Sequence, residues 1–491
     1  MTLRVRHPAT LVFALFASLY LLTYKGVSAG DDLYHLVAMK GWLHGRLSLP
    51  EALGTGLPRG PHGFFVASGR DGRPQLSLPP GLALLSLPLG GIGEQMDDGP
   101  DGDASAELAG LSLVRAPAED VARALRRVRE RPFAFCAGLV NPIVTAATVT
   151  LFFVVTLWLG ATPRAALAST LLLGIATIVW PYATSYWSQP IAGFCLLATF
   201  AGLLRFEQTG RLGPLAWAGL ACGYGVLTRT ELLLAVPWAA LYLWLAVRAR
   251  PGMRSTAVAA FAAPLVACAL LWAGWNWIRF GDWLQAGSIH QRAFLRSLRP
   301  ATLLLSVPAQ LLSFQRSLFV FSPPLLLALA AWPSFRRRHR TFGTIVAGVV
   351  ATFFVFYSGF IMWSAPASWG PRFLVPLTAL LMLPVGAWLE GSTRRVRMAI
   401  ALGGVGALVQ LAVALPGYSL DAVAAYWTSG PRTLTALLLK SDLVPELRLL
   451  LRGELDVWWL WNPGAMVAAS VLAAIATSAG IGLRTAVMRE D

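Results

Sequence analysis

Residues 9–36 read ATLVFALFASLYLLTYKGVSAGDDLYHL, in which an uncharged run, 9–24, leads toward an acidic pair, Asp31-Asp32. Basic residues precede the run, as they precede the apolar core of a signal peptide. The cleavage sequence that follows is weak, so we expect an uncleaved first membrane helix. This helix would deliver the two aspartates to a membrane surface.

The composition extends this membrane character to the whole chain. Of 491 residues, 56% are hydrophobic and 13% are charged, against about 25% charged in an ordinary soluble domain. The mean hydropathy of +0.61 excludes a soluble globular enzyme and a disordered chain. The net charge of +16 could indicate nucleic acid. In a polytopic protein, however, excess Arg and Lys hold short loops in the cytoplasm, so we exclude nucleic-acid binding.

The apolar runs predict an all-α polytopic membrane protein with about twelve transmembrane helices, since roughly 20 apolar residues cross a hydrocarbon core. Basic clusters fall wherever an even number of spans has been crossed. This pattern places both termini in the cytoplasm and the protein in the cell (inner) membrane. The predicted spans are 9–24, 135–159, 165–180, 190–205, 213–228, 231–247, 255–278, 318–334, 342–361, 373–390, 397–415 and 464–484.

The segments predicted on the opposite side hold nearly all the unusual polar residues, and one of them conflicts with the rule. The arginine-rich stretch 104–131 would become cytoplasmic if 76–93 were itself a span. We favour a re-entrant or interfacial 76–93, because prolines and Gly90-Gly91 interrupt it. The stretch would then lie along the membrane surface. The external segments are 25–133, 181–189, 229–230, 279–317, 362–372 and 416–463.

The acidic pair has two interpretations. Adjacent carboxylates at a membrane surface repel each other and lose solvation, which is costly unless a function uses them. In the structural alternative, Asp31 is the N-cap and Asp32 lies at the positive end of a helix. An amphipathic helix from Leu36 to Leu43 would then follow at the surface.

Further motifs follow the acidic pair along the chain. Residues 71–88, DGRPQLSLPPGLALLSLP, form a loop that enters a second apolar helix through Pro-Pro-Gly. The others are WPYATSYWSQ (180–189), GYGVLTRTE (223–231), NWIRFGD (276–282), RSLFVFSP (316–323) and WGPRFLVP (369–376). Together with Asp31-Asp32, this series resembles the C-type (GT-C) membrane glycosyltransferases over roughly residues 1–390. Where relatives often carry an acid in the second external loop, this sequence has Gln189.

The resemblance implies a polyprenyl-phosphate-linked sugar donor, used outside the cytoplasm where nucleotide sugars are absent. It implies a glycan, lipid or protein acceptor, whose hydroxyl gives its proton to a carboxylate as it attacks the anomeric carbon. Asp31 is the candidate base, and Asp32 would raise its pKa or orient the acceptor. Arg372 is the first candidate for the departing phosphate, with membrane anchoring by snorkelling as the alternative. Further candidate substrate-binding residues are Tyr34, His35, Gln189, Arg279, His290 and Arg316.

Arg229 and Glu231 interrupt an apolar stretch of more than thirty residues. Ionisable groups at membrane depth are expensive and usually functional, so we count both as candidates for substrate binding. The structural alternative is a mutual ion pair between two short helices.

The sequence assigns no metal ligands. His35, His44 and His62 share one predicted loop, but their spacing is neither HxxxH nor HExxH. The four cysteines lie in apolar runs without CxxC spacing, which indicates neither a disulfide scaffold nor a zinc cluster. Some relatives use a divalent ion, so the resemblance leaves a metal possible and no cofactor certain. Aromatic residues in 416–463 indicate an interfacial belt, with stacking on an acceptor sugar as the alternative.

The sequence leaves other functional classes open. A secondary transporter or lipid flippase would also suit twelve spans, although the halves show no convincing self-similarity and the first external loop is long for that class. An inactive scaffold with dispensable aspartates is a third possibility. We predict a catalytic module over residues 1–390 and further transmembrane helices over 391–491.

Overall fold

The structure of the chain is a computed structural model. It describes residues 2–27, 31–53, 65–97, 125–285, 298–360, 363–365, 368–416, 441, 443–461 and 463–488. Within these ranges the chain is mainly helical, and its one sheet is a short antiparallel hairpin. The predicted all-α class is confirmed.

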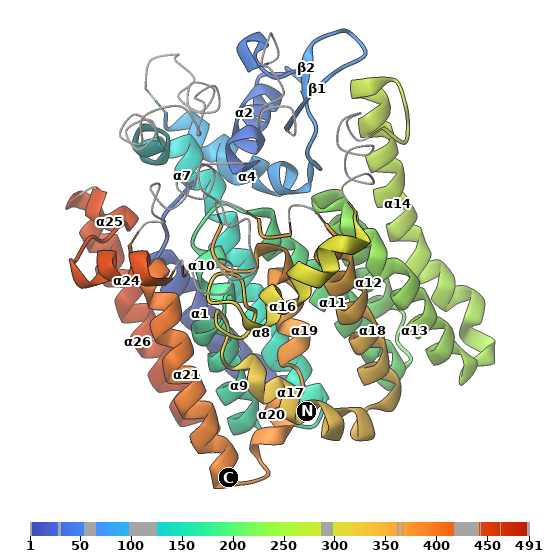
Figure 1. Cartoon of the computed structure of the whole chain (residues 1–491). Helices are drawn as coiled ribbons and strands as arrows, with labels where there is room; N and C mark the ends of the chain where they lie inside the picture. The colour runs from blue at the N-terminus through green and yellow to red at the C-terminus, as the bar shows by residue number, and fades with distance from the viewer. Residues whose placement is uncertain are drawn as a thin grey trace.

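Long helices run between the lower and upper ends of the bundle in Figure 1. Their apolar sequences contain few helix breakers, and the prolines within them are compatible with the surrounding packing. These helices are α1 (Thr2–Leu22), α8 (Val140–Trp158), α9 (Pro163–Ala176), α11 (Ser188–Thr209), α12 (Gly213–Thr228), α13 (Val236–Arg248), α14 (Arg254–Phe280), α17 (Leu325–Arg338), α18 (Arg340–Gly359), α21 (Thr393–Ala414) and α26 (Met466–Met488).

The described chain contains 7 helices that are long and apolar enough to cross a membrane. Three shorter apolar helices, His7–Leu22, Pro163–Ala176 and Arg372–Met382, coincide with further predicted spans. The protein is thus a membrane protein with several apolar helices, and the count of twelve spans stays a prediction.

Short elements complete the two ends and the breaks between helices. At the upper end lie α2 (Asp31–Leu43), α4 (Gly81–Gln95), α7 (Pro132–Gly138) and the hairpin of β1 (Val66–Ser68) and β2 (Pro74–Leu76), in which Ala67 pairs with Gln75. The remaining short elements are η1 (Glu51–Leu53), α10 (Val179–Ala183), η2 (Thr230–Ala235), η3 (Pro251–Met253), η4 (Pro300–Thr302), α16 (Leu303–Leu312), η5 (Arg372–Leu377), α19 (Thr378–Met382), α20 (Val385–Leu389), α24 (Leu443–Leu451), α25 (Trp458–Trp461) and η6 (Pro463–Ala465).

Helix α4 covers most of residues 76–93, the segment whose placement the sequence leaves open. It packs against α2 and α7 across the upper end of the bundle, and it does not continue through the bundle (Figure 1). Its 15 residues are shorter than a full span requires. The helix is continuous through Pro88 and Gly90-Gly91, which we expected to interrupt it, and the interfacial placement of residues 76–93 stays a prediction. Most of the arginine-rich stretch lies outside the described residues, and residues 125–130 of it are helical.

Helix α2 differs from the amphipathic surface helix that we expected. Every residue from Leu33 to Met39 is at most 4% exposed. The helix is enclosed because α4 and β2 pack against it and because the Tyr34 ring lies 4.9 Å from that of Phe65. Its polar positions therefore lie inside the upper layer, where a sequence pattern alone would not place them.

Glycines allow the closest helix contacts in the bundle. A Cβ added at Gly219 on α12 would overlap the backbone carbonyl oxygen of Phe261 on α14. A backbone oxygen cannot move aside as a flexible side chain can, so the crossing of α12 and α14 depends on this missing methyl group.

We expect Gly219→Ala to destabilise the protein by about 1–3 kcal/mol, the usual cost of overpacking. Thermal unfolding of the purified protein in detergent measures the change. Gly274→Ala on α14 is the matched control, because an added Cβ there meets nothing within 4 Å. Equal unfolding midpoints for the two variants would show that the α12–α14 contact is looser than described.

Candidate functional site

A buried ion pair lies where α12 ends at the upper part of the bundle. The backbone of Arg229 is extended, so the helix stops after Thr228 and restarts as η2. Arg229 Nε donates to Glu231 Oε1 at 2.8 Å, and its Nη1 donates to Ser188 Oγ at 3.0 Å. The Tyr357 hydroxyl donates to the same Glu231 oxygen at 2.8 Å. Arg229 is 8% exposed. The mutual ion pair weighed from the sequence is therefore present.

Gln189 joins Arg372 to this pair. It is fully buried at the start of α11. With its amide oriented so that the oxygen faces the arginines, that oxygen accepts from Arg229 Nη1 at 3.0 Å and from Arg372 Nε at 3.3 Å. Two guanidinium groups thus converge on one amide. We call Ser188, Gln189, Arg229, Glu231, Tyr357 and Arg372 the arginine cluster.

Aromatic rings support both guanidinium groups. The Arg372 guanidinium carbon lies 4.8 Å from the centre of the Trp187 ring and 5.3 Å from that of Phe373. Phe373 in turn stacks on Tyr357, with ring centres 5.0 Å apart. Cation–π contacts position the plane of a guanidinium group, whose N–H groups donate hydrogen bonds at its edge. Among the side chains that the structure describes, the cluster combines two guanidinium groups with one carboxylate.

A backbone pairing brings the segment before the acidic pair to the same end of the bundle. Lys25 N donates to Thr184 O at 2.8 Å, and Tyr186 N donates to Gly26 O at 3.2 Å. Trp187 and the cluster residues Ser188 and Gln189 follow Tyr186 directly in the sequence. Asp31, which starts α2, lies four residues beyond Val27, so the chain can carry it at most ~14 Å away from Val27.

Other predicted site residues lie outside the description. The structure gives the backbone of Asp31 and Asp32 as the first turn of α2, but their side chains lie outside the described part of the chain. All of His290 lies outside it as well. Their predicted roles stay predictions.

Arg279 and Arg316 are both buried. Arg279 donates to the Leu76 carbonyl and to Asn276 Oδ1, and its own carbonyl accepts from Arg70 N at 2.8 Å. These bonds anchor the hairpin to α14. Arg316 is 1% exposed and donates to Gln315 O at 3.0 Å. Both geometries give these arginines structural contacts, and their predicted binding of substrate stays untested.

Tyr34 and His35 lie on α2, close to the predicted acidic pair. Each is 4% exposed, and burial raises the pKa of the Tyr34 hydroxyl above its usual range. A neutral hydroxyl inside the upper layer can donate a hydrogen bond at any physiological pH. Their predicted contact with substrate stays a prediction.

Sequence analysis missed the contacts that fix residues 21–27. Arg129 Nε donates to Val27 O at 2.6 Å, and Arg129 Nη1 pairs with Asp456 Oδ2 at 2.6 Å. Trp458 N donates to Tyr24 O at 3.2 Å. Arg129 and Asp456 are 327 positions apart in the sequence, so no local pattern could have paired them. The tryptophans of 416–463 are thus used for tertiary contacts as well as for a possible belt.

Lys25 is buried close to these contacts of Arg129, which we call the Arg129 clamp. Its Nζ donates to the carbonyls of Val413 and Pro416, just where α21 ends. Burial lowers the pKa of Lys25 to about 8, with Asp456 acting in the opposite direction. The amine thus ties α1 to α21 at a cost in desolvation.

No metal centre is evident in the described part of the chain. No group of three His, Cys, Asp or Glu side chains there could hold an ion. The side chains of Asp31 and Asp32, and all of His62, lie outside that part. A divalent ion therefore stays a possibility drawn from the resemblance.

The sequence matches no protein-family model and no curated protein. Its fold, however, is similar to solved structures. ArnT from Cupriavidus metallidurans, crystallised with undecaprenyl phosphate, gives a TM-score of 0.50 at 16% sequence identity, over 99% of this chain and 76% of that one. An oligosaccharyltransferase from Archaeoglobus fulgidus gives 0.48 at 12% identity, over 90% and 55%. Arabinosyltransferase EmbB from Mycobacterium smegmatis gives 0.44 at 15%, over 98% and 40%. The similarity to ArnT confirms a GT-C-type fold.

We expect the buried state of Lys25 to make stability depend on pH. Between its pKa of about 8 and the usual value of 10.5, the unfolded chain binds a proton that the folded chain does not, so stability rises with pH. The full effect is about 3 kcal/mol. Unfolding midpoints from pH 7.5 to 10 should rise for the wild type relative to Lys25→Met.

Lys40→Met is the matched control for this experiment. Lys40 lies at the same end of the molecule and forms a partly exposed ion pair with Glu94. If Lys25→Met and the wild type follow parallel curves over this pH range, the amine is not buried as described.

Proposed function

We propose that the protein is a membrane glycosyltransferase that moves a sugar from a polyprenyl-phosphate-linked donor to an acceptor hydroxyl. The observation that carries the proposal is the convergence of Arg229 and Arg372 on Gln189, at the end of the bundle to which the Gly26–Ser185 pairing leads the acidic pair. The fold supports it, since the similar structure of ArnT was solved with undecaprenyl phosphate bound.

The arginine cluster has the chemistry to hold a departing phosphate. Glu231 balances the charge of Arg229, and Arg372 adds a second positive charge, its guanidinium carbon 4.8 Å from the centre of the Trp187 ring. A guanidinium group can form paired hydrogen bonds to phosphate oxygens. Positive charge fixed beforehand stabilises the negative charge that accumulates on the leaving group in the transition state.

Asp31 is the proposed general base. The acceptor oxygen forms a bond to the anomeric carbon while the bond from that carbon to the phosphate oxygen breaks. The acceptor proton passes to the Asp31 carboxylate, and the negative charge leaves on the lipid phosphate. Asp32, the next residue in the first turn of α2, would orient the acceptor.

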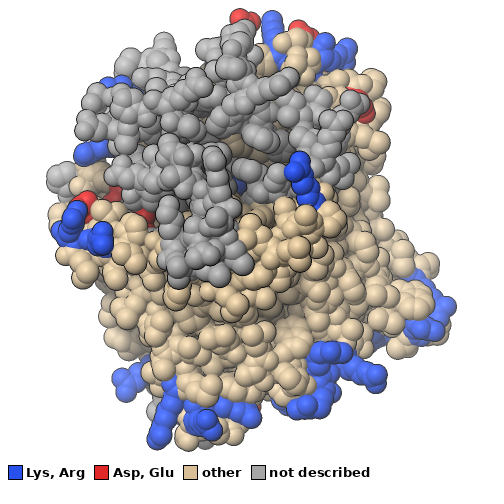
Figure 2. Space-filling model, in the orientation of Figure 1, with Lys and Arg blue, Asp and Glu red and all other residues tan. Residues whose placement is uncertain are grey.

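The distribution of basic residues supports an external site. Lys and Arg side chains gather along the lower edge of the molecule in Figure 2, and both termini lie at the lower end in Figure 1. Basic residues hold loops in the cytoplasm, so the upper end would face outward from an inner membrane. The basic residues at the lower end include Arg248, Arg254, Arg336, Arg337, Arg338, Arg340, Arg394 and Arg397.

We expect Asp31→Asn to lower sugar transfer by about 10²–10⁴-fold, as loss of a general base does. The assay follows labelled sugar from a polyprenyl-phosphate donor in membranes that contain the protein, and it compares Asp32→Asn in parallel. Asp71→Asn is the control, because Asp71 lies on an exposed turn of the same predicted loop. Wild-type transfer by both neighbouring variants would overturn the assigned base. Substrate uptake without any covalent product would indicate a transporter instead.

We expect Arg372→Gln to lower kcat/KM for the donor by about 10- to 100-fold, since it removes charged hydrogen bonds to a phosphate whose negative charge grows in the transition state. Arg372→Lys should recover part of this loss, because it restores the charge without the paired donors. Arg73→Gln is the control, an exposed arginine at the same end of the molecule. An unchanged kcat/KM in Arg372→Gln would place the phosphate elsewhere.

A further inference from the structure

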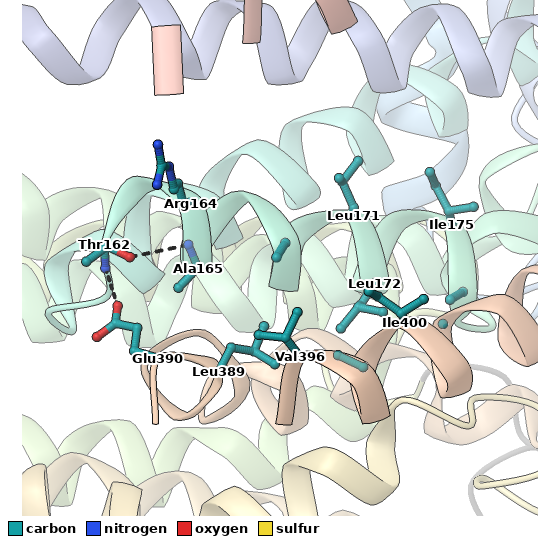
Figure 3. Close-up of a pocket in the computed structure, with 14 residues that line it drawn as sticks. Thr162, Arg164, Ala165, Leu171, Leu172, Ile175, Leu389, Glu390, Val396 and Ile400 are labelled. Carbon is teal, nitrogen blue, oxygen red and sulfur yellow. Dashed lines mark hydrogen bonds between the residues drawn. The ribbon is translucent and has the colours of Figure 1, made fainter. Parts of the chain in front are cut away.

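A groove of about 550 Å³ lies between α9 and α21, toward the end of the bundle opposite the arginine cluster (Figure 3). Most of its lining is apolar, and its polar residues, Thr162, Arg164 and Glu390, share one end. The polar end of the groove lies at the start of α9, whereas Trp187 and the arginine cluster lie beyond the other end of that helix.

Two helix faces form the groove. On α9, Arg164 is followed at helical spacing by Ala168, Leu171 and Ile175, and Figure 3 shows Arg164, Leu171 and Ile175 on the same side of the helix. On α21, the opposite wall includes Ile400, which is 69% exposed. Because the side chain of Ala168 is small, space remains beside it in the groove. The groove therefore opens sideways, toward the lipid that surrounds the helices.

Basic residues outnumber acidic ones around the polar end of the groove. Glu390 Oε1 accepts from Thr162 N at 2.6 Å, on the side of α9 away from Arg164 (Figure 3). The start of α21 adds three arginines within its first turns, one of which, Arg395, stacks on Trp388 at 4.8 Å. Arg164 and Glu390 line this end and their charges cancel, while Arg394, Arg395 and Arg397 at the start of α21 flank the lining residue Val396 and make the surroundings basic.

The length of the groove matches one leaflet of a membrane. The eleven-residue rise from Arg164 to Ile175 corresponds to ~17 Å along the helix. Half of a hydrocarbon core is ~15 Å thick. A chain lying between the two faces would thus run from the basic end to the middle of the membrane.

We propose that this groove binds one anionic phospholipid of the leaflet at the basic end. One acyl chain lies between α9 and α21, and the phosphate contacts Arg164. The positive charge selects a lipid with net negative charge over a zwitterionic one of the same chain length. The polyprenyl donor is a poor fit, because its phosphate is required at the other end of the bundle. The proposal does not depend on glycosyl transfer.

Native mass spectrometry of the purified full-length protein tests the proposal. The protein is titrated with phosphatidylglycerol or with phosphatidylcholine of identical acyl chains. We expect one tightly retained phosphatidylglycerol in the wild type. Ala168→Trp, which fills the hollow, should abolish its retention, and Arg164→Gln should weaken it about fivefold, the effect of one basic residue near an anionic lipid.

Two matched variants control for general effects. Ala259→Trp adds the same ring on an exposed position of α14, and Arg337→Gln removes an exposed arginine elsewhere at the same end. Ile400→Trp blocks the groove from its other wall and replaces Ala168→Trp if that variant unfolds. Both controls should retain the lipid as the wild type does.

Three results would overturn the proposal. Equal retention of the two phospholipids would remove the role of the positive charge. Unchanged retention in both groove-filling variants would place the lipid elsewhere. Displacement of phosphatidylglycerol by undecaprenyl phosphate, or a dimer that the groove-filling variants break, would assign the groove to another occupant.

Discussion

The pairing of Gly26 with Ser185 is the constraint on which the upper end of the molecule depends. It joins the segment that leaves α1 to the segment that enters α11, and these segments lead respectively to Asp31 and to Gln189. The pair is short, but it is fixed from both sides by the clamp of Arg129 on Val27 and by the tertiary contacts of Trp458. The end of a membrane helix and the start of a distant one thereby meet at the same end of the bundle.

The charged groups at this end are costly to bury, and each is compensated by a partner at close range. Arg229 and Glu231 form a pair that well-packed apolar residues could replace at little cost, but removal of one partner alone would leave a buried charge, at a cost of about 3–5 kcal/mol. A site that must hold an anionic group needs such fixed charge. The ion pair therefore contributes more to fixing the position of the Arg229 guanidinium group than to the free energy of unfolding.

Local sequence patterns predicted what depends on local physics. Apolar runs located the long helices, whereas Pro88 and Gly90-Gly91, which we expected to interrupt an apolar run, lie inside the continuous helix α4. From the sequence, Arg229 and Glu231 could be either substrate-binding groups or a structural ion pair. The structure shows that they form an ion pair. The enclosure of α2 and the contact between Arg129 and Asp456 depend on segments far apart in the chain, for which one sequence carries no signal.

The C-terminal helices belong to the same physical argument. Helix α26 packs along α1, and α21 packs along α9 and ends where Lys25 donates to its last carbonyls. Helix α1, which precedes the acidic pair in the sequence, therefore packs against the C-terminal part of the chain as well as against α8. A series of contacts thus connects α9 to α21, α21 to Lys25, and the adjacent Gly26 to the segment that precedes the arginine cluster. A molecule seated in the seam between α9 and α21 would therefore restrain both ends of the bundle at once.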